Sequence, residues 1–442
     1  MKRIVLYIII IVTTLPFLAS CSQNIITTSP PLTITPPPTT TPPLSVLPEG
    51  DMTALVDGNS AFALDLYQKL KTADGNFFYS PYSISTALAM TYAGAGGDTA
   101  QQMAKALHFT LTGKNLDAAF SVLDQMLKSR GKGVTVPVEG QGGNITQEQV
   151  EGFRLNIVNA LWGQKDYSFL KDFLDVIQQY YGGGFNTLDF INATEAARLA
   201  INKWASDSTN GRIQNLLASG VLTPMTRLVL TNAIYFKAHW AYEFAKSATS
   251  DGLFHLLDGS TVTVPLMHQQ HMFSYAEGDN YQAIQLPYLG NDVAMTILLP
   301  REGQFAAFEN SLDSQELSKI VAQMTSKEVN VTLPKFSFES SFRLDQTLAN
   351  MGMPDAFTAG TADFSGMTGN KELFIGAAIH KSFVAVDELG TEAAAVTAVA
   401  MAGAAMPSTP VDFDANRPFI FLIQDVATGS ILFTGRVSNP AA

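Results

Sequence analysis

The segment from Glu388 to Met406 constrains the fold of this 442-residue chain more than any other. After Glu392 no charged residue occurs before Asp412, although turn formers such as Gly403 and Pro407 indicate that the distal part is a loop. Exposed loops are normally polar, because nothing in them needs burying. A long uncharged loop is therefore expected to have a second, buried state.

The proximal part of the segment alternates as a strand does. One face of an extended chain would hold only small uncharged residues, namely Thr391, Ala393, Ala395 and Thr397, with Glu392 on the other face. Such a strand could enter a packed sheet without burying a charge, and Gly390 would supply the bend at its start. The alternative is an alanine-rich helix, since alanine is the best helix former, and the flanking sequence decides between the two.

The flanking sequence resembles the serpin family in five ordered motifs. In chain order these are NFFYSPYSISTAL (76–88), LTNAIYFKAHW (230–240), LPKFSFE (333–339), AAIHKSFVAVDELGTEAAA (377–395) and FDANRPFIFLI (413–423). Residues 425–440 then read as a closing hairpin with its turn at Thr428-Gly429. The resemblance covers the chain from about residue 51 to the end.

The resemblance implies an α+β fold with large mixed sheets, surrounding helices and an exposed reactive loop. The residue patterns agree, because helical periodicity dominates early and strand-like runs dominate late. Helices are predicted at 59–70, 81–93, 116–127, 169–181 and 195–208, and a glycine-containing loop at 131–143. Strands are predicted at 155–161, 229–236, 262–267, 282–286, 293–299, 328–332 and 381–386.

The N-terminal region reads as targeting and spacer sequence. Residues 1–20 have two basic residues before an apolar run and are interpreted as a lipoprotein signal peptide, because Leu18 to Cys21 resembles a bacterial lipobox. Cys21 would be lipidated, and residues 21–50 would form a Thr/Pro-rich extended stalk. The expected location of the domain at 51–442 is extracellular or at the cell surface, anchored to a membrane by lipid. An ordinary secretory signal with a chance cysteine is the alternative.

Composition excludes several classes of partner. The formal net charge is −12, and without residues 1–20 it is −14, which argues against nucleic acid and other polyanions. The helix at 116–127 has basic residues only at its ends, so heparin-type activation is not expected. Cys21 is the only cysteine, which leaves no internal disulfide. We expect a monomer without cofactors.

Enzyme motifs do not occur in the sequence. It has no G-x-S-x-G, H-E-x-x-H or Walker loop, and no cysteine remains for a Cys-His pair. His268 and His271 are spaced as metal ligands can be, but they lack a nearby cysteine or acidic partner, so we interpret them as structural polar residues. No metal site and no enzyme activity are expected.

The resemblance instead implies a suicide-substrate inhibitor of serine endopeptidases, with papain-like cysteine proteases as a second target class. The implied hinge residues are Glu388, Gly390, Thr391, Glu392, Ala393, Ala394, Ala395 and Thr397. Two departures from the family pattern are Val396, which is larger than usual, and Leu389, where a charge is common. The alternative is a non-inhibitory serpin-fold binding or carrier protein.

The reactive bond is placed by counting from the hinge. The usual family spacing from Glu388 and Gly390 puts it between Ala404 and Ala405, whereas counting back from Pro418 points to Met406-Pro407. We prefer the first count, since hinge length sets how much strand can insert. The uncharged residues at this bond predict elastase-like or subtilisin-like targets.

The resemblance also implies two groups of residues under the sheet that must open. Ser80, Ser83, Asn232 and His380 match the buried polar cluster that holds the sheet closed, with plain core hydrogen bonding as the alternative. Trp240 matches the tryptophan at the end of the sheet where insertion begins, with an ordinary buried aromatic side chain as the alternative.

Overall fold

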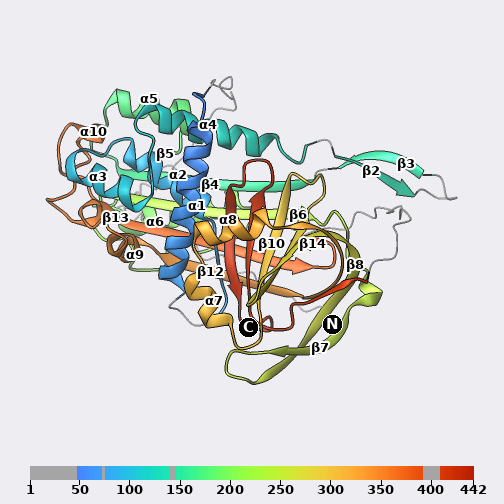
Figure 1. Ribbon diagram of the computed structural model, residues 1–442. Coiled ribbons are helices and arrows are strands. Elements are labelled where there is room, and N and C mark those ends of the chain that lie inside the picture. Colours follow the sequence, from blue (N-terminus) through green and yellow to red (C-terminus); the bar gives the residue numbers. More distant parts are fainter. Residues whose placement is uncertain (1–46, 72–74, 133, 140–144, 151, 392–408) are drawn as a thin grey trace, which may run out of the picture. The chain divides into compact units, whose positions relative to one another are not determined.

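The computed structural model describes residues 47–71, 75–132, 134–139, 145–150, 152–391 and 409–442 (Figure 1). Its helices are α1 Asp51–Leu70, α2 Pro81–Tyr92, α3 Gly97–Ala106, α4 Lys114–Ser129, α5 Lys171–Tyr181, α6 Thr194–Ser208, α7 Phe305–Ser311, α8 Ser314–Ala322, α9 Asp345–Asn350 and α10 Ser365–Thr368. Two short 3₁₀ turns cover Lys246–Ala248 and Asp355–Phe357.

Strands dominate the second half of the chain. They are β1 Phe77–Tyr79, β2 Val134–Glu139, β3 Ile145–Val150, β4 Phe153–Gln164, β5 Phe185–Leu188, β6 Leu228–His239, β7 Ser250–His255, β8 Thr261–Glu277 and β9 Tyr281–Pro287. They continue with β10 Val293–Pro300, β11 Thr325–Pro334, β12 Phe336–Arg343, β13 Ile375–Asp387, β14 Gly390–Thr391, β15 Val411–Asp414, β16 Phe419–Asp425 and β17 Ile431–Val437.

These strands form two large mixed sheets and one small one. The 9-stranded sheet has the order β1-β17-β16-β10-β9-β8-β11-β15, with β7 on β8, and the 6-stranded sheet has the order β12-β13-β14-β6-β4-β5. The strands β2 and β3 pair with each other as a separate 2-stranded sheet. The expected α+β architecture is therefore confirmed, and the turn at Thr428-Gly429 joins β16 to β17.

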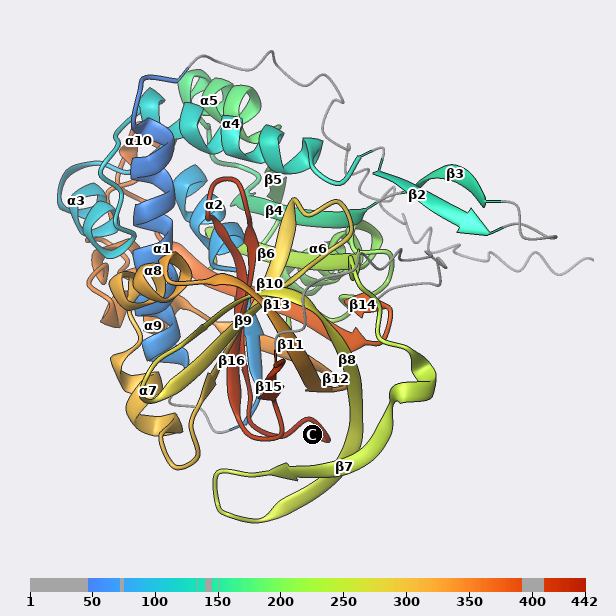
Figure 2. The ribbon, with the colours of Figure 1, turned by 45° about the vertical axis from the view of Figure 1, so that its right-hand side comes forward.

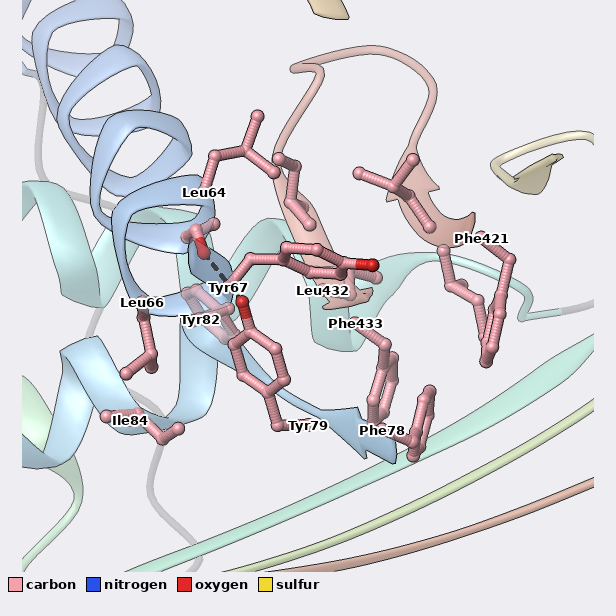
Figure 3. Close-up of a cluster of buried hydrophobic side chains, with 14 of the residues drawn as sticks. Leu64, Leu66, Tyr67, Phe78, Tyr79, Tyr82, Ile84, Phe421, Leu432 and Phe433 are labelled. Atoms are coloured by element: carbon pink, nitrogen blue, oxygen red, sulfur yellow. Dashed lines mark hydrogen bonds between the residues drawn. The ribbon is translucent and has the colours of Figure 1, made fainter. Parts of the chain in front are cut away.

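The main core lies between the two large sheets. Phe236 on β6 packs against Phe433 on β17, with ring centroids 5.5 Å apart, and Phe336 on β12 packs against Phe421 on β16 at 5.6 Å. Phe78 stacks on both Phe421 and Phe433 (Figure 3). Because aromatic side chains bury much apolar surface, the contacts of Phe236 and Phe336 hold the two sheets face to face, while Phe78 on β1 packs against neighbours in its own sheet.

Local sequence signals explain several element boundaries. The side chain of Ser80 accepts a hydrogen bond from the Ser83 amide and caps α2, while Pro81 occupies the first helical position. Gly182 ends α5 in the left-handed conformation, with φ 69°, as expected for a glycine helix stop.

Two expectations about elements are corrected. The segment 131–143 was expected to be a loop, but β2 occupies residues 134–139 and pairs with β3. Glycines around the segment and Pro137 within it obscured the alternating valines of a strand. The first helix begins at Asp51 and not at Asn59, because the buried Leu55 and Val56 extend its apolar face toward the N-terminus.

No helix in the described ranges has the length and apolar character needed to cross a bilayer.

Candidate functional site

The 6-stranded sheet has a gap between β13 and β6 that β14 fills. The two strands pair in parallel along most of their length, with His380 opposite Asn232 and Phe383 opposite Tyr235. Beyond Phe383 the direct pairing stops, and Gly390 and Thr391 of β14 pair antiparallel with both neighbours. The start of the predicted hinge therefore already lies inside the sheet.

Only glycine fits the first position of β14. Gly390 has a φ of 150°, and a Cβ atom added to it would lie 2.0 Å from the carbonyl oxygen of Ala238. Such an approach is impossible for any residue with a side chain. The structure thus places Gly390, the glycine predicted at the hinge, at the start of β14.

Thr391 is buried at the second position, with 1% of its surface exposed. Its hydroxyl lies 2.7 Å from the Tyr288 hydroxyl, so one of the two donates to the other. Tyr288 stacks on Trp240, with ring centroids 4.6 Å apart and an interplanar angle of 7°. The small uncharged side chain at this position is thus buried beside Tyr288.

Trp240 secures the turn that leads into β14. Its indole Nε1 donates to the carbonyl oxygen of Asp387 at 3.0 Å, and its backbone amide donates to the carbonyl oxygen of Leu389 at 2.9 Å. The Asp387 carboxylate accepts from the Leu389 amide at 2.9 Å. The backbone of the hinge is therefore held by hydrogen bonds before the chain reaches Gly390.

Glu388 fixes the same turn from its other side. Its carboxylate accepts from Lys335 Nζ at 2.8 Å and from the Thr249 hydroxyl at 2.9 Å. Burial opposes its ionisation, but these hydrogen bonds outweigh that effect and hold the pKa of Glu388 below its usual range. The pair joins the β13–β14 turn to the residue between β11 and β12.

His239 lies beside the hinge without a partner for one ring nitrogen. Its Nδ1 is buried without a hydrogen bond and lies 3.7 Å from the Glu243 carboxylate. Burial and the charge of Lys237 lower the pKa of His239, while Asp387 opposes that shift. In the strand register His239 is the residue directly opposite Gly390.

Below the gap, a buried polar cluster joins β13, β6, β4 and α2. The Nδ2 of Asn232 donates to Ser83 and to the Asn159 Oδ1, and Ser83 Oγ also donates to Asn159 at 3.0 Å. Ser80 donates through Oγ to the Leu432 carbonyl oxygen at 2.6 Å. The structure thus brings together all four residues that the sequence comparison assigned to this cluster.

His380 completes the cluster in a defined protonation state. Its Nε2 faces the backbone amide of Ser80 at 3.2 Å, and an amide can only donate, so Nε2 must accept. The proton is therefore on Nδ1, which donates to the Asn232 Oδ1. Burial lowers the pKa of His380 to about 3, so the ring is neutral at physiological pH.

Comparison with known proteins decides the family. The model of the serpin family, described as "Serpin (serine protease inhibitor)", matches residues 57–440. The chain belongs to the serpin family. The family is described as one of serine protease inhibitors and not of enzymes, so family membership confirms that this protein is not an enzyme.

Individual serpins match over nearly their whole length. An uncharacterized serpin-like protein of Thermococcus kodakarensis is 42% identical over 398 residues, which cover 89% of this chain and 88% of that protein. Human leukocyte elastase inhibitor is 39% identical over 407 residues, or 88% of this chain and 100% of its own. A crystal structure of maspin superposes with a TM-score of 0.79 at 28% identity, covering 89% of this chain and 100% of maspin.

Part of the sequence-predicted site of this serpin lies outside the described residues. This applies to Cys21, to Glu392 and the hinge residues after it, and to both candidate reactive bonds. Four residues of the site were missed by sequence reasoning: Asn159, Thr249, Tyr288 and Lys335. Only Lys335, inside the LPKFSFE motif, had a sequence signal, since Asn159, Thr249 and Tyr288 lie far from their partners in the chain and outside the five motifs.

Other candidate sites in this serpin have structural explanations. His268 Nδ1 lies 3.2 Å from the Thr332 hydroxyl, and His271 stacks on Tyr242. No group of three or more His, Cys, Asp or Glu side chains in the described ranges could hold a metal ion. Around the end of α4, Lys128 pairs with Asp124 and Arg130 with Asp425.

Proposed function

We propose that this serpin inhibits serine endopeptidases of the elastase-like or subtilisin-like kind as a suicide substrate. The observation that supports this most directly is β14, because two hinge residues already occupy the gap between β13 and β6. The relatives named leukocyte elastase inhibitor, about 40% identical, support the same class of target.

In this mechanism the protease supplies the catalytic groups. Its catalytic serine attacks the carbonyl carbon of Ala404, the bond to the Ala405 nitrogen breaks, and that nitrogen leaves with a proton from the protease histidine. The new ester joins Ala404 to the serine while the hinge side becomes a free strand. The inhibitor supplies the bait, the hinge and a sheet that can open.

Extending the register of β14 shows what the free strand would meet. Continuing the two antiparallel ladders one residue at a time places Ala393 between Val384 and Phe236, and Thr397 between His380 and Asn232. Thr397 would share the buried face with Thr391, because the two positions are an even number apart. Its hydroxyl would replace a partner in the polar cluster as the His380–Asn232 bond opens.

The energetics favour insertion once the loop is cut. Insertion replaces the parallel ladder between β13 and β6 by two antiparallel ladders, and antiparallel pairing is slightly more stable per residue. The inserted face would be small and uncharged, so no unpaired charge is buried. The intact loop cannot insert fully, because its distal end is tied to β15, which pairs in parallel with β11.

The uncharged loop supports the choice of target. A trypsin-like pocket needs Lys or Arg, and neither occurs between residues 393 and 411. Ala404→Arg is therefore expected to shift inhibition toward trypsin-like proteases. If Met406→Arg produces that shift and Ala404→Arg does not, the bond is at Met406-Pro407.

We also propose that the protein is an extracellular or cell-surface monomer anchored to a membrane by a lipid on Cys21, with residues 21–50 as a spacer. Cys21→Ser should release the protein from the membrane fraction or block its maturation, as shown by fractionation and intact mass. A processed Cys21→Ser protein that stays in the membrane would contradict the anchor.

Incubation with leukocyte elastase and with subtilisin tests the central proposal. The expected result is a complex that survives denaturing electrophoresis. A C-terminal fragment is also expected, with the mass of a chain that begins at Ala405. Cleavage of the loop without any complex would contradict inhibition and favour the carrier alternative.

A further inference from the structure

His239 is a titratable side chain that lies buried beside the hinge. The residue is 7% exposed, and its Nδ1 has no hydrogen-bond partner among the described residues. Buried polar atoms in native proteins nearly always have a partner, so an orphaned ring nitrogen requires an explanation. The position of His239 in the sheet and the charges around it provide one.

His239 belongs to a row of three residues that crosses the gap in the 6-stranded sheet. In the strand register, Gly390 of β14 lies between Asp387 of β13 and His239 of β6. Figure 2 shows β14 beside the end of β13, where the chain turns back. Because Gly390 has no side chain, only backbone separates β13 from β6 here, across two strand spacings or about 10 Å. A charge on His239 therefore arises directly beside the strand that holds the hinge.

Lys237 places a positive charge on the same face of β6. Residues two apart in a strand point to the same face, so the side chains of Lys237 and His239 lie on one side. Phe236, on the other face, packs against the second large sheet. On the neighbouring strand β4, Arg154 is the residue opposite Lys237 in the register. A proton on His239 would therefore add a second positive charge beside an existing one.

The described acidic groups near His239 give its Nδ1 no hydrogen bond. The Glu243 carboxylate, in the turn after β6, lies 3.7 Å from Nδ1, which is too long for a hydrogen bond. The Asp387 carboxylate accepts from the amides of Leu389 and Gly390, at 2.9 and 3.3 Å. A protonated imidazole would therefore have no acceptor in place for Nδ1 while the sheet is closed.

These surroundings oppose ionisation of both His239 and Glu243. Burial and the charge of Lys237 lower the pKa of His239, and Asp387 opposes this only in part. Burial and the charge of Asp387 raise the pKa of Glu243, against the effect of Lys246. The closed sheet therefore favours a neutral histidine over an ion pair with Glu243.

Release of β14 from the gap would reverse this preference. Without the hinge strand beside it, His239 gains contact with water, and its pKa returns toward the ordinary value of 6.5. A proton that binds more tightly to the open form shifts the equilibrium toward that form. Because the pKa is lower in the closed form, that form keeps its full stability above about pH 6.5 and loses it as the pH falls.

We propose that His239 is a pH-sensitive positioning residue for the hinge. Neutral, it allows β14 to remain between β13 and β6, and protonated, it favours release of β14 from the gap. The consequence for proteases rests on the proposed inhibitory function. A hinge outside the sheet leaves more chain free for a protease to bind, so inhibition should be faster in mildly acidic surroundings.

Hydrogen exchange at two amides reports whether β14 is in place. The Trp240 amide donates to the Leu389 carbonyl oxygen, and the Phe244 amide donates to the Glu388 carbonyl oxygen, both at 2.9 Å. Release of β14 with its turn breaks both bonds. Exchange of these amides is measured at single-residue resolution in the full chain at pH 5.5 and 7.5, with correction for the chemical exchange rate at each pH.

Three variants separate the charge of His239 from its shape. His239→Phe keeps a buried ring that cannot be protonated, Lys237→Gln removes the neighbouring charge, and Lys237→Arg keeps that charge as the matched control. His380 and the Glu388–Lys335 pair are present in every variant, so their own response to pH cancels in the comparison. Melting temperatures at pH 7.5 show whether each variant is folded.

We expect the protection of the two amides to fall by about threefold or more from pH 7.5 to 5.5 in the wild type and in Lys237→Arg. The fall should be smaller in Lys237→Gln, where the imidazolium has no lysine beside it, and absent in His239→Phe. The imidazole NMR signal of His239, identified by its absence from His239→Phe, should titrate below pH 6.5.

Inhibition of leukocyte elastase provides the functional readout. The rate of complex formation by the wild type, divided by the rate for His239→Phe, should rise severalfold from pH 7.5 to 5.5. The pH dependence of the protease itself cancels in this ratio.

An equal loss of protection in the wild type, in Lys237→Gln and in a folded His239→Phe would overturn the proposal and leave the inhibitory function standing. Faster inhibition at pH 5.5 without any change at the two amides would also overturn it. A loss of protection that requires His239, in a wild type that forms no covalent complex with elastase, would support the role of His239 and contradict the inhibitory function.

Discussion

At the scale of single residues, His380 makes stability depend on pH. Its pKa is about 3 in the folded protein and about 6.5 in the unfolded chain, which therefore binds more protons between these values. The contribution of His380 to the free energy of unfolding is therefore complete above about pH 6.5. It decreases as the pH falls, by about 2 kcal/mol at pH 5. Denaturant titrations at pH 5 and pH 7.5 measure this difference.

His380→Gln is the matched variant. It should be less stable than the wild type at neutral pH, because it disturbs the bonds to Ser80 and Asn232, but it should lack this part of the pH dependence. An equal loss of stability at pH 5 in both proteins would show that other groups are responsible.

Thr391 provides the second prediction at this scale. Thr391→Arg would place a charge at a buried position beside Tyr288, where an unpaired charge costs on the order of several kcal/mol. We expect β14 to leave the sheet and the loop to be cleaved as a substrate, with the stoichiometry of inhibition raised at least tenfold. Thr391→Ser, which keeps the hydroxyl, is the control, and unchanged complex formation by Thr391→Arg would contradict insertion through this gap.

At the scale of elements, the contact between α4 and α5 contains an unfavourable buried carboxyl. Asp117 accepts from the Tyr181 hydroxyl at 2.7 Å, but burial raises the pKa of Asp117 to about 6. Since an aspartate in the unfolded chain ionises near 4, the folded state loses stability as the pH rises from about 4 to 6, by about 2–3 kcal/mol. Its effect opposes that of His380 in this range, so each must be measured against its own variant.

Asp117→Asn should remove this penalty and keep an oxygen that accepts from Tyr181. We expect the variant to be more stable than the wild type at pH 7.5 and equal to it below pH 4. Differential scanning calorimetry at both pH values measures the difference. A loss of stability at pH 7.5 would mean that the charged form of Asp117 has a favourable partner.

At the scale of the whole molecule, the native state should be less stable than the loop-cleaved state. Insertion of about ten residues forms two antiparallel ladders and removes the parallel β13–β6 ladder, so the net gain is on the order of 10 hydrogen bonds, or on the order of 10 kcal/mol at about 1 kcal/mol per hydrogen bond. The melting temperature should therefore rise markedly after cleavage of the loop. Equal melting temperatures of the two forms would mean that the native sheet stores no strain, and would favour a carrier function.

The sequence by itself determined the family, the α+β class and the positions of five of the ten described helices and seven of the seventeen described strands, together with the closing hairpin, because these follow from local periodicity and from motifs such as LPKFSFE. It also indicated the small uncharged hinge face, since side-chain size and charge can be read directly. Short-range signals could not reveal β2, because glycines and a proline lie in and around its alternating pattern.

Only the tertiary structure decided which partners meet at the site. Asn159 on β4, Tyr288 directly after β9 and Lys335 between β11 and β12 are far apart in the chain, and their roles depend on how the strands pair, which no local pattern specifies. The same is true of the insertion of Gly390 and Thr391 between β13 and β6, and of the position of His239 opposite Gly390. Long-range strand pairing fixes these positions, because a shift of one residue would turn every side chain to the opposite face.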